Sequence, residues 1–331
     1  MSAPLPAPPT ADGQTLSVGI DIGGSKVLAV VLDPANRVLG QARRPTQHGA
    51  PGVVDSVRAT VFDALASSGA HAEQVCVVGV GVPGIVTPGS GVVRHAVNLG
   101  LGPVEVDLAA LLSAELDAPV VVENDVNAAA LGAATLLAAG GTWSGTGDLG
   151  LVSIGTGLAA GVVIGGQLHR GSRGAAGEIG HVPVDPHGLL CTCGQYGCLE
   201  TIASGASLTA AWRARVGARA DEETVWAALA ADDAGADEVV ATFASGVAAA
   251  VRLLLLTWDL ERVVLAGGVT EVGEPLLAAV RKALQDSAAQ SPFLAALDLT
   301  HRVDLAPRDA SVAAVGAAVA ARRALSPERV S

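Results

Sequence analysis

Residues 16–32 read LSVGIDIGGSKVLAVVL, and they give the clearest indication of how this chain begins to fold. Two runs rich in β-branched residues, 16–22 and 27–32, lie on either side of a glycine pair. This pattern predicts two strands joined by a tight turn. A third strand is expected near Val38, after a turn at 33–36. Such an antiparallel start differs from the strand–helix opening of a dinucleotide-binding domain.

The same pattern returns in the middle of the chain, where residues 149–164 read LGLVSIGTGLAAGVVI. We interpret this second copy as an internal duplication of the opening hairpin. Between the copies, apolar residues recur on one face of a predicted helix at about 52–67. Two nearly continuous apolar runs, 75–82 and 120–122, are typical of parallel strands buried on both faces. The chain is therefore expected to have an α/β fold with ligands at the carboxyl ends of these strands.

The length of 331 residues predicts two lobes. We expect a small lobe of residues 16–121 plus 308–325 and a large lobe of residues 122–307. Residues 1–15 are rich in proline and are expected to form a disordered tail. An alanine-rich helix is predicted over 307–322, with Asp309 as its cap.

Composition narrows the class of protein. The formal net charge of −12 disfavours nucleic acid as a partner, because an acidic protein repels the phosphate backbone. The longest uncharged run, 149–168, is long enough to cross a membrane, but its glycines fit two buried strands better. The first residues lack the basic start and apolar core of a signal peptide. We therefore expect a cytoplasmic protein without a membrane anchor.

The turn of the opening hairpin has the residues that a phosphate-binding loop needs. Gly23 and Gly24 would allow backbone N–H groups to approach a phosphate closely. Ser25 and Lys26 can add donors, and Asp21 would face Mg²⁺ directly or through water. A simple tight hairpin explains the same residues equally well, since short glycine motifs are weak signals.

Two further glycine motifs favour the nucleotide interpretation. Gly155-Thr156-Gly157 forms the turn of the second hairpin. Gly267-Gly268 follows the apolar run 263–265 and precedes a predicted helix, which suits the nucleoside end of a ligand. Each motif is weak alone, but together they predict a nucleotide cleft.

Glu123-Asn124-Asp125 comes directly after a fully apolar strand, where a cleft is expected. A carboxylate at this place could accept the proton of a hexose hydroxyl during phosphoryl transfer. Either Asn124 or Asp125 could instead cap the helix that begins there. The residues alone leave both roles open.

Three of the four cysteines, Cys191, Cys193 and Cys198, fall within eight residues. With His181 they match the ligand count of a closed structural Zn²⁺ site. In a chain without an export signal, clustered cysteines are more often metal ligands than disulfides. Cys76 lies in the middle of a predicted strand and is expected in the core.

Taken together, these motifs resemble the ROK family (repressor, open reading frame, kinase). The motifs DIGGSK, END, EIGH, CTCGQYGCLE and LAGG occur in that order, and the resemblance extends from about residue 16 to residue 325. It implies an actin-like, ribonuclease-H-like sugar kinase fold, with two lobes and a cleft between them. It also implies ATP-dependent phosphorylation of a hexose, most commonly glucose, with Mg²⁺ and a structural Zn²⁺. Family members are commonly homodimers or dimers of dimers.

The resemblance further assigns roles to individual residues, with Asp125 as general base. Sugar hydroxyls would be bound by Gly84, Asn98, Asn124, Asp125, Glu178, His181 and Glu200. ATP would contact Asp21, Gly23, Gly24, Ser25, Lys26, Gly155, Thr156, Gly157, Gly267 and Gly268. Zinc would be held by His181, Cys191, Cys193 and Cys198, which would tie Glu178 and Glu200 into one wall of the sugar pocket.

The chain departs from the family pattern at three places. Ser25 stands where threonine is usual, and Ala133 stands where many members have glutamate. No aromatic residue follows Asn98-Leu99, in a loop that would shape the sugar pocket. N-acetylmannosamine, N-acetylglucosamine and fructose are therefore alternative substrates.

Two other functions are compatible with the resemblance. Repressors of the family carry a helix-turn-helix domain before the first strand, but only about fifteen residues precede it here, too few for three helices. A catalytically silent sugar-binding protein is disfavoured because Asp125 and the phosphate turns are intact. Polyphosphate is a less expected donor than ATP, since polyphosphate-using relatives resemble this chain less at the cysteine motif.

Overall fold

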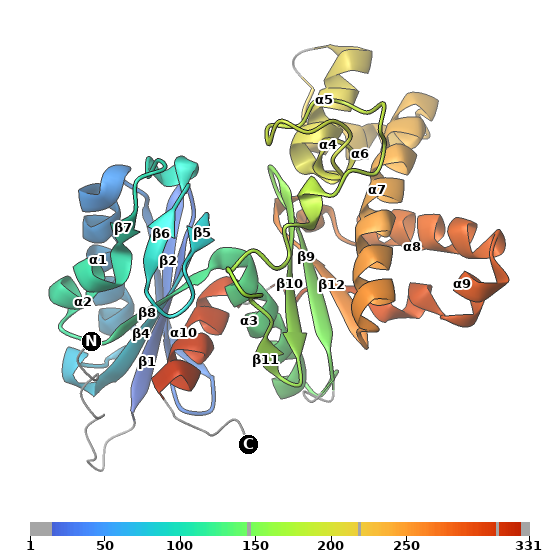
Figure 1. Cartoon of the computed structure of the whole chain (residues 1–331). Helices are drawn as coiled ribbons and strands as arrows, with labels where there is room; N and C mark the ends of the chain where they lie inside the picture. Colours follow the sequence, from blue (N-terminus) through green and yellow to red (C-terminus); the bar gives the residue numbers. More distant parts are fainter. Residues whose placement is uncertain (1–14, 144–146, 218–219, 309–310, 326–331) are drawn as a thin grey trace. The chain divides into compact units, whose positions relative to one another are not determined.

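The computed structural model describes residues 15–143, 147–217, 220–308 and 311–325 (Figure 1). Contacts between residues divide the chain into two compact units. Among the described residues, unit 1 comprises 15–143, 166–176 and 311–325. Unit 2 comprises 147–165, 177–217 and 220–308.

Unit 1 opens with the predicted hairpin and closes with the C-terminal helix. Its strands are β1 (Leu16–Ile22), β2 (Lys26–Leu32), β3 (Val38–Pro45), β4 (Val75–Val82), β5 (Ile85–Val86), β6 (Val92–Arg94), β7 (Val106–Asp107), β8 (Val120–Asn124) and β11 (Gln167–Leu168). Its helices are α1 (Gly49–Ser68), α2 (Leu108–Leu116), α3 (Asp125–Ala139) and α10 (Val312–Leu325).

The main sheet of unit 1 has the strand order β3-β2-β1-β4-β8. β1 is antiparallel to β2 and parallel to β4, and β4 is parallel to β8. α1 and α2 pack on one face of the sheet, where Val18, Ile20 and Ile22 point. α10 and α3 pack together on the other face. Both faces of β1 and β4 are therefore buried, as their continuous apolar sequences predict.

α10 approaches the sheet and α3 very closely because glycines lie at the contacts. A Cβ atom on Gly19 of β1 would lie 1.9 Å from the carbonyl oxygen of Ala314. A Cβ atom on Gly316 of α10 would lie 1.7 Å from the carbonyl oxygen of Ala128 in α3. Backbone cannot yield as a flexible side chain can, so only glycine fits at these two positions.

Gly316→Ala is accordingly expected to destabilise the protein by about 2 kcal/mol or more, since overpacking forces the backbone of α10 away from α3. The midpoint of urea denaturation measures the effect. Gly102→Ala is the matched control, because a Cβ atom there would meet nothing within 4 Å. Equal midpoints for the two variants would show that α10 and α3 are not packed this closely.

Unit 2 repeats the arrangement of unit 1. Its strands are β9 (Leu149–Ile154), β10 (Leu158–Ile164), β12 (Arg262–Ala266) and β13 (Val303–Leu305). Its helices are α4 (Glu200–Ala203), α5 (Gly205–Val216), α6 (Glu222–Ala230), α7 (Ala234–Trp258), α8 (Glu274–Ala289) and α9 (Pro292–Ala296). β9 is antiparallel to β10 and parallel to β12, which is parallel to β13. In unit 1, β1 pairs with β2 and β4 in the same way, and β4 with β8, so the predicted internal duplication is confirmed.

The predicted division of the chain differs from the observed one at its first boundary. The chain was expected to enter the second lobe at residue 122, but α3 and the segment 166–176 are grouped with unit 1 by their contacts. The reason is the close packing of α3 on α10, which a reading of consecutive elements does not reveal. The second boundary, near 308, agrees with the prediction.

The C-terminal helix also begins later than predicted. The chain is still extended at Ala306, whose N–H donates to the carbonyl oxygen of Leu265 at 2.8 Å. α10 therefore spans Val312–Leu325 rather than 307–322. The expected cap, Asp309, and residues 1–14 of the expected tail lie outside the described residues.

One helix of unit 2, α7, is long and apolar enough to cross a membrane by length and composition. In the described structure, 61% of its apolar stretch is buried, and Val240, Phe243 and Val251 belong to the core of unit 2. Packing of this kind is what the core helix of a compact domain requires. The run 149–168, also considered above, forms β9, β10 and β11.

Candidate active site

The parallel register of unit 1 brings three strand ends into line. Asp21 of β1 pairs with Gly81 of β4, and Gly81 pairs with Glu123 of β8. Gly81 also lies against the first residue of α3, since a Cβ atom there would be 3.6 Å from the Cα of Asp125. Asp21, the carboxylate just before the glycine turn, and Asp125, the candidate base, thus lie at the same edge of the sheet.

The pKa of Asp21 is shifted by this arrangement. Burial, and secondly the nearby charge of Asp125, raise the pKa of Asp21 from 3.8 to about 6, while Lys26 opposes the shift. Two carboxylates held near each other in a partly buried site are a natural position for a divalent cation, which would favour their ionised forms.

The raised pKa makes the stability of metal-free protein depend on pH. At pH 4 the folded chain holds the Asp21 proton, and the unfolded chain, with a pKa of 3.8, still holds roughly half of it, so little stability has been lost. As the pH rises from there to about 6, the unfolded chain ionises freely while the folded chain must ionise a buried group, and the folded state loses stability. Asp21→Asn should therefore stabilise the protein by roughly 1–2 kcal/mol at pH 8 and by little at pH 4. Urea denaturation in magnesium-free buffer at both pH values measures this. An equal gain at both values would contradict the assignment.

The turn between β1 and β2 is held from outside by residues that the sequence did not suggest. The N–H of Gly23 donates to the carbonyl of Lys26 at 2.9 Å. Thr46 Oγ1 donates to the carbonyl of Gly23 at 2.7 Å, and His48 Nε2 lies 3.0 Å from the carbonyl of Gly24. The carbonyl groups are therefore occupied, while the side chains of Ser25 and Lys26 are exposed.

Asn98 and Gly84, both predicted sugar ligands, lie beside these elements. A Cβ atom on Gly24 would be 3.2 Å from the Cβ of Asn98, whose side chain is exposed. Gly84 has a φ of +100°, which favours glycine, and its carbonyl accepts a hydrogen bond from Asn124 Nδ2 at 3.1 Å. Within unit 1, the glycine turn therefore lies beside Asn98, and Gly84 is hydrogen-bonded to Asn124 at the start of α3.

The structure decides which residue caps α3. Asn124 Oδ1 accepts hydrogen bonds from the N–H groups of Val126 and Asn127 at 3.0 and 3.1 Å. Asp125 is the first residue of α3, and its Oδ1 also accepts from Val126 N–H at 2.9 Å. Asn124 is thus the N-cap, and Asp125 lies at the positive end of the helix dipole, which favours a carboxylate.

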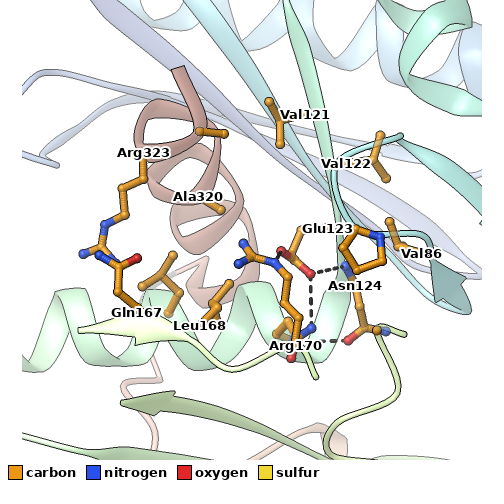
Figure 2. A pocket seen from close by; sticks show the side chains of 16 residues that line it. Val86, Val121, Val122, Glu123, Asn124, Gln167, Leu168, Arg170, Ala320 and Arg323 are labelled. Atoms are coloured by element: carbon orange, nitrogen blue, oxygen red, sulfur yellow. Dashed lines mark hydrogen bonds and ion pairs between the residues drawn. The ribbon is translucent and has the colours of Figure 1, made fainter. Parts of the chain in front are cut away.

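Glu123, beside these two residues, lines a cavity of about 310 Å³ within unit 1 (Figure 2). It is 6% exposed and forms an ion pair with Arg170 at 2.5 Å. The sequence placed Glu123 in the END motif without a role and did not single out Arg170. A buried acid beside a candidate base was the only signal available.

In unit 2 the second glycine turn is packed against Glu200. Glu200 Oε2 accepts the N–H of Leu158 at 2.9 Å. A Cβ atom on Gly157 would be 2.5 Å from the same oxygen, so glycine is needed for the carboxylate to reach the backbone. Gly267, with a φ of +97°, lies against the backbone of Ile154, the last residue of β9. The predicted motifs at 155–157 and 267–268 are therefore brought together.

An open groove of about 640 Å³ adjoins this turn, and apart from Thr156 the sequence did not predict its walls. It is lined by Thr156, Ala206, Thr209, Ala210, Arg213, Ala214 and Glu222. The N–H of Gly205, the first residue of α5, donates to the carbonyl of Gly155 at 2.8 Å. Burial, and secondly Asp221, raise the pKa of Glu222. The groove has the size and the hydrogen-bonding groups for the nucleoside part of a ligand.

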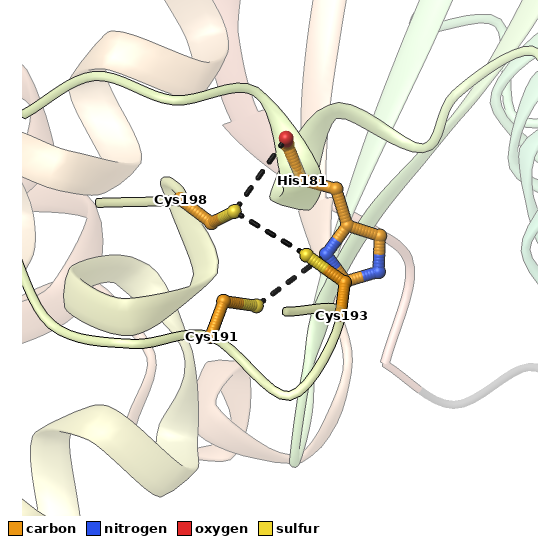
Figure 3. Close-up of side chains that lie close together, drawn as sticks. All are labelled: His181, Cys191, Cys193 and Cys198. Atoms are coloured by element: carbon orange, nitrogen blue, oxygen red, sulfur yellow. Dashed lines mark hydrogen bonds between the residues drawn. The ribbon is translucent and has the colours of Figure 1, made fainter. Parts of the chain in front are cut away.

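The predicted metal ligands converge in unit 2 (Figure 3). The donor atoms of His181, Cys191, Cys193 and Cys198 lie within 4.8 Å of one another. Cys193 Sγ is 3.6 Å from Cys198 Sγ, and Cys191 Sγ is 3.7 Å from His181 Nδ1. Two sulfur ligands of a tetrahedral Zn²⁺, each at about 2.3 Å, would be about 3.8 Å apart. The four donors therefore fit a closed zinc site.

The loop that carries the cysteines depends on its glycines. Gly194 and Gly197 have positive φ angles of +91° and +69°. Gly197 also lies directly against the carbonyl of Asp185, and its own carbonyl accepts the N–H of Val184 at 2.8 Å. Hydrogen bonds from Gln195 lower the pKa of the Cys193 thiol to about 6, which favours the thiolate that metals bind. Cys76, expected in the core, is instead half-buried in β4.

In unit 2, the candidate metal ligands and the predicted sugar ligands lie on the same or adjoining backbone segments. Glu178 precedes the short turn Ile179–His181, and its side chain is exposed. A Cβ atom on Gly180 would be 2.1 Å from the carbonyl of Leu158, so this turn packs on the strand that Glu200 holds. His181 directs Nδ1 towards the sulfur atoms, which leaves Nε2 for another partner.

Comparison with known proteins supports one family. The sequence pattern of the ROK family matches residues 17–324. The chain belongs to the ROK family. Among ROK relatives, it is 32% identical to a glucokinase of Halalkalibacterium halodurans over 80% of this chain and 84% of that protein. It is likewise 32% identical to an N-acetylmannosamine kinase of Escherichia coli O157:H7, over 86% of this chain and 91% of that protein.

A solved ROK structure gives the same result. The glucokinase of Streptomyces griseus in complex with glucose and AMPPNP is 32% identical and superimposes with a TM-score of 0.75, covering 93% of this chain and 99% of that one. The predicted actin-like, ribonuclease-H-like fold of the ROK sugar kinases is thereby confirmed. Unit 1 holds Asp21, Gly23, Gly24, Ser25, Lys26, Gly84, Asn98, Asn124 and Asp125. Unit 2 holds Gly155, Thr156, Gly157, Glu178, His181, Cys191, Cys193, Cys198, Glu200, Gly267 and Gly268.

Proposed function

We propose that this ROK protein transfers the terminal phosphoryl group of ATP to a hexose hydroxyl, with glucose as its substrate. The observation that carries the proposal is the position of Asp125 at the start of α3, at the same strand ends as Asp21 and its glycine turn. A base beside a phosphate turn is what phosphoryl transfer to an alcohol requires. The similarity to glucokinases supports glucose as the acceptor.

In the proposed mechanism, the carboxylate of Asp125 accepts the proton of the sugar hydroxyl as its oxygen attacks the terminal phosphorus and ADP leaves. Asn98 and Asn124 would orient neighbouring hydroxyl groups; Asn124 keeps one N–H beyond its bond to Gly84. Mg²⁺, held at Asp21, would neutralise charge on the phosphate oxygens. Backbone N–H groups of the turns at 23–26 and 155–157 would bind those oxygens.

Unit 2 would supply the other sugar contacts. Glu200 gives one carboxylate oxygen to Leu158 and has the other for a hydroxyl. His181 would bind zinc through Nδ1 and a hydroxyl through Nε2, which reconciles its two predicted roles. Zinc would stiffen the segments that carry Glu178 and Glu200, without taking part in the chemistry. The groove beside Thr156 would take the nucleoside of ATP.

N-acetylmannosamine is the second candidate substrate, since a kinase for this sugar is equally similar over more of the chain. A coupled assay of ADP release tests the proposal with glucose, fructose, mannose, N-acetylmannosamine and N-acetylglucosamine. The highest kcat/KM is expected for glucose. Turnover of N-acetylmannosamine alone would select the second candidate. Tight sugar binding without turnover would instead support the sugar-binding protein.

The remaining proposals concern the state of the protein. We propose a cytoplasmic enzyme, because a thiol cluster suited to zinc is stable in a reducing compartment and α7 packs into the core of unit 2. The family resemblance suggests a homodimer or a dimer of dimers, which light scattering measures. Replacing ATP by polyphosphate in the same assay tests the choice of donor.

A further inference from the structure

Glu123 is a buried carboxylate whose oxygens are fully engaged by the protein. It is 6% exposed. Its Oε1 accepts hydrogen bonds from the backbone N–H of Asn124 at 3.0 Å and from Asn127 Nδ2 at 3.1 Å. Its Oε2 accepts from Arg170 Nε at 2.5 Å. The two donors to Oε1 lie on either side of Asp125 in the sequence: Asn124 comes directly before it, and Asn127 follows it by two residues.

Arg170 connects this cluster to a second segment of unit 1 (Figure 2). In the part of the chain that the structure describes, it is the ion-pair partner of Glu123. The carbonyl of Arg170 also accepts the N–H of Ala176 at 3.3 Å, which closes the loop 170–176. Glu178, a proposed sugar ligand, follows Ala176 by two residues. Arg170 therefore binds the start of α3 through its side chain and closes the loop that leads to Glu178 through its backbone carbonyl.

We propose that Glu123 and Arg170 are positioning residues, an ion pair between a buried carboxylate and a partly exposed guanidinium that fixes Asp125 and the 170–176 loop in the geometry for phosphoryl transfer. This inference rests on the proposed function. The Glu123 carboxylate already accepts hydrogen bonds from three donors of the protein. It therefore acts through Asp125 and does not contact the sugar itself. Reacting groups tolerate displacements of less than about 1 Å before the rate falls about 100-fold. Loss of Arg170 leaves the buried charge of Glu123 unpaired, and loss of the Glu123 charge releases Arg170 from the start of α3, so local structure must rearrange in either case.

Glu123→Gln is the decisive variant. Its amide oxygen can still accept from Asn124 and Asn127, but its amide nitrogen cannot accept from Arg170. We expect kcat to fall about 10- to 100-fold, while the KM for ATP changes less than about 2-fold. Arg170→Lys should restore most of the activity lost in Arg170→Met, because it returns the charge. Glu123→Gln combined with Arg170→Met should lose little more than either alone.

Asp33→Asn is the matched control, a buried carboxylate of unit 1 at the β2–β3 turn. Asp33 is 2% exposed and pairs with Arg37 at 2.6 Å. The Asp33→Asn variant should lower the melting temperature as Glu123→Gln does, but it should leave kcat unchanged. If Glu123→Gln behaves in the same way, the pair is merely structural and the proposal is overturned.

Hydrogen exchange separates this inference from the proposed function. The amides of Val126 and Asn127 should exchange at least about 10-fold faster in Glu123→Gln than in the wild type or in Asp33→Asn, because the first turn of α3 loosens. Unchanged exchange overturns the positioning role even if the wild type is an active kinase. If these amides exchange faster in Glu123→Gln but the wild type phosphorylates no sugar, the ion pair still orders the start of α3 and the proposed function is wrong.

Discussion

Asp125→Asn is expected to lower kcat for hexose phosphorylation by about 10²–10⁴-fold or more, because an amide cannot accept the proton of the attacking hydroxyl. The KM for the sugar should change little, since the amide keeps its size and its hydrogen bonding. The helix should also remain intact, because the new Oδ1 can still accept from Val126 N–H and Asn124 is the N-cap. Initial rates in the coupled assay, together with sugar binding by calorimetry, measure the two effects separately.

The matched control is Asp107→Asn, which makes the same chemical change elsewhere in unit 1. Asp107 caps α2 by accepting the N–H of Ala110 at 2.9 Å, and asparagine caps a helix equally well. Its kcat should equal that of the wild type. Near wild-type turnover by Asp125→Asn would remove the residue from the role of base and leave its position at the start of α3 as a structural feature.

Cys198→Ser is expected to abolish zinc binding and to lower the melting temperature sharply. Cys198 is fully buried, and its sulfur lies 3.6 Å from that of Cys193, so its loss leaves the cluster with three of its four donors. Structural zinc contributes folding free energy outright, and loss of one thiolate removes most of that contribution. Activity should fall as well, because the loop no longer supports Glu178 and Glu200.

Elemental analysis of freshly purified protein should find about one zinc per chain in the wild type and none in Cys198→Ser. Cys76→Ser serves as the control, since Cys76 lies in β4 of unit 1 and not in the cluster of unit 2. It should keep its zinc and nearly all of its stability. Absence of zinc from the wild type would refute the metal site and leave a cluster of reduced thiols.

Much of the fold could be predicted because local patterns determine it. The strands at 16–22, 75–82, 149–154 and 158–164 have the predicted bounds, since an alternation of apolar runs and glycine turns marks both ends of each strand. The recurrence of that pattern revealed the duplication that the two sheets share. The convergence of the four candidate metal ligands was also predictable, because three of them lie within eight residues and thiols have few other reasons to crowd together.

Other features arise from contacts between residues far apart in the chain. The boundary near 145 follows from the packing of α3 on α10, where Gly132 and Gly316 allow the two backbones to touch. The support of the glycine turn between β1 and β2 by Thr46 and His48 joins residues more than twenty positions apart. No periodicity encodes such contacts.

The residues at the start of α3 show the distinction most clearly. The sequence by itself determined that Glu123, Asn124 and Asp125 would follow a buried strand, because the apolar run before them ends there. Only the tertiary structure decided which of them caps the helix, which pairs with Arg170 and which lies beside Asp21. The role of a polar side chain depends on the partners near it, and here folding brings Asp21, Gly84 and Arg170 from three distant parts of the chain.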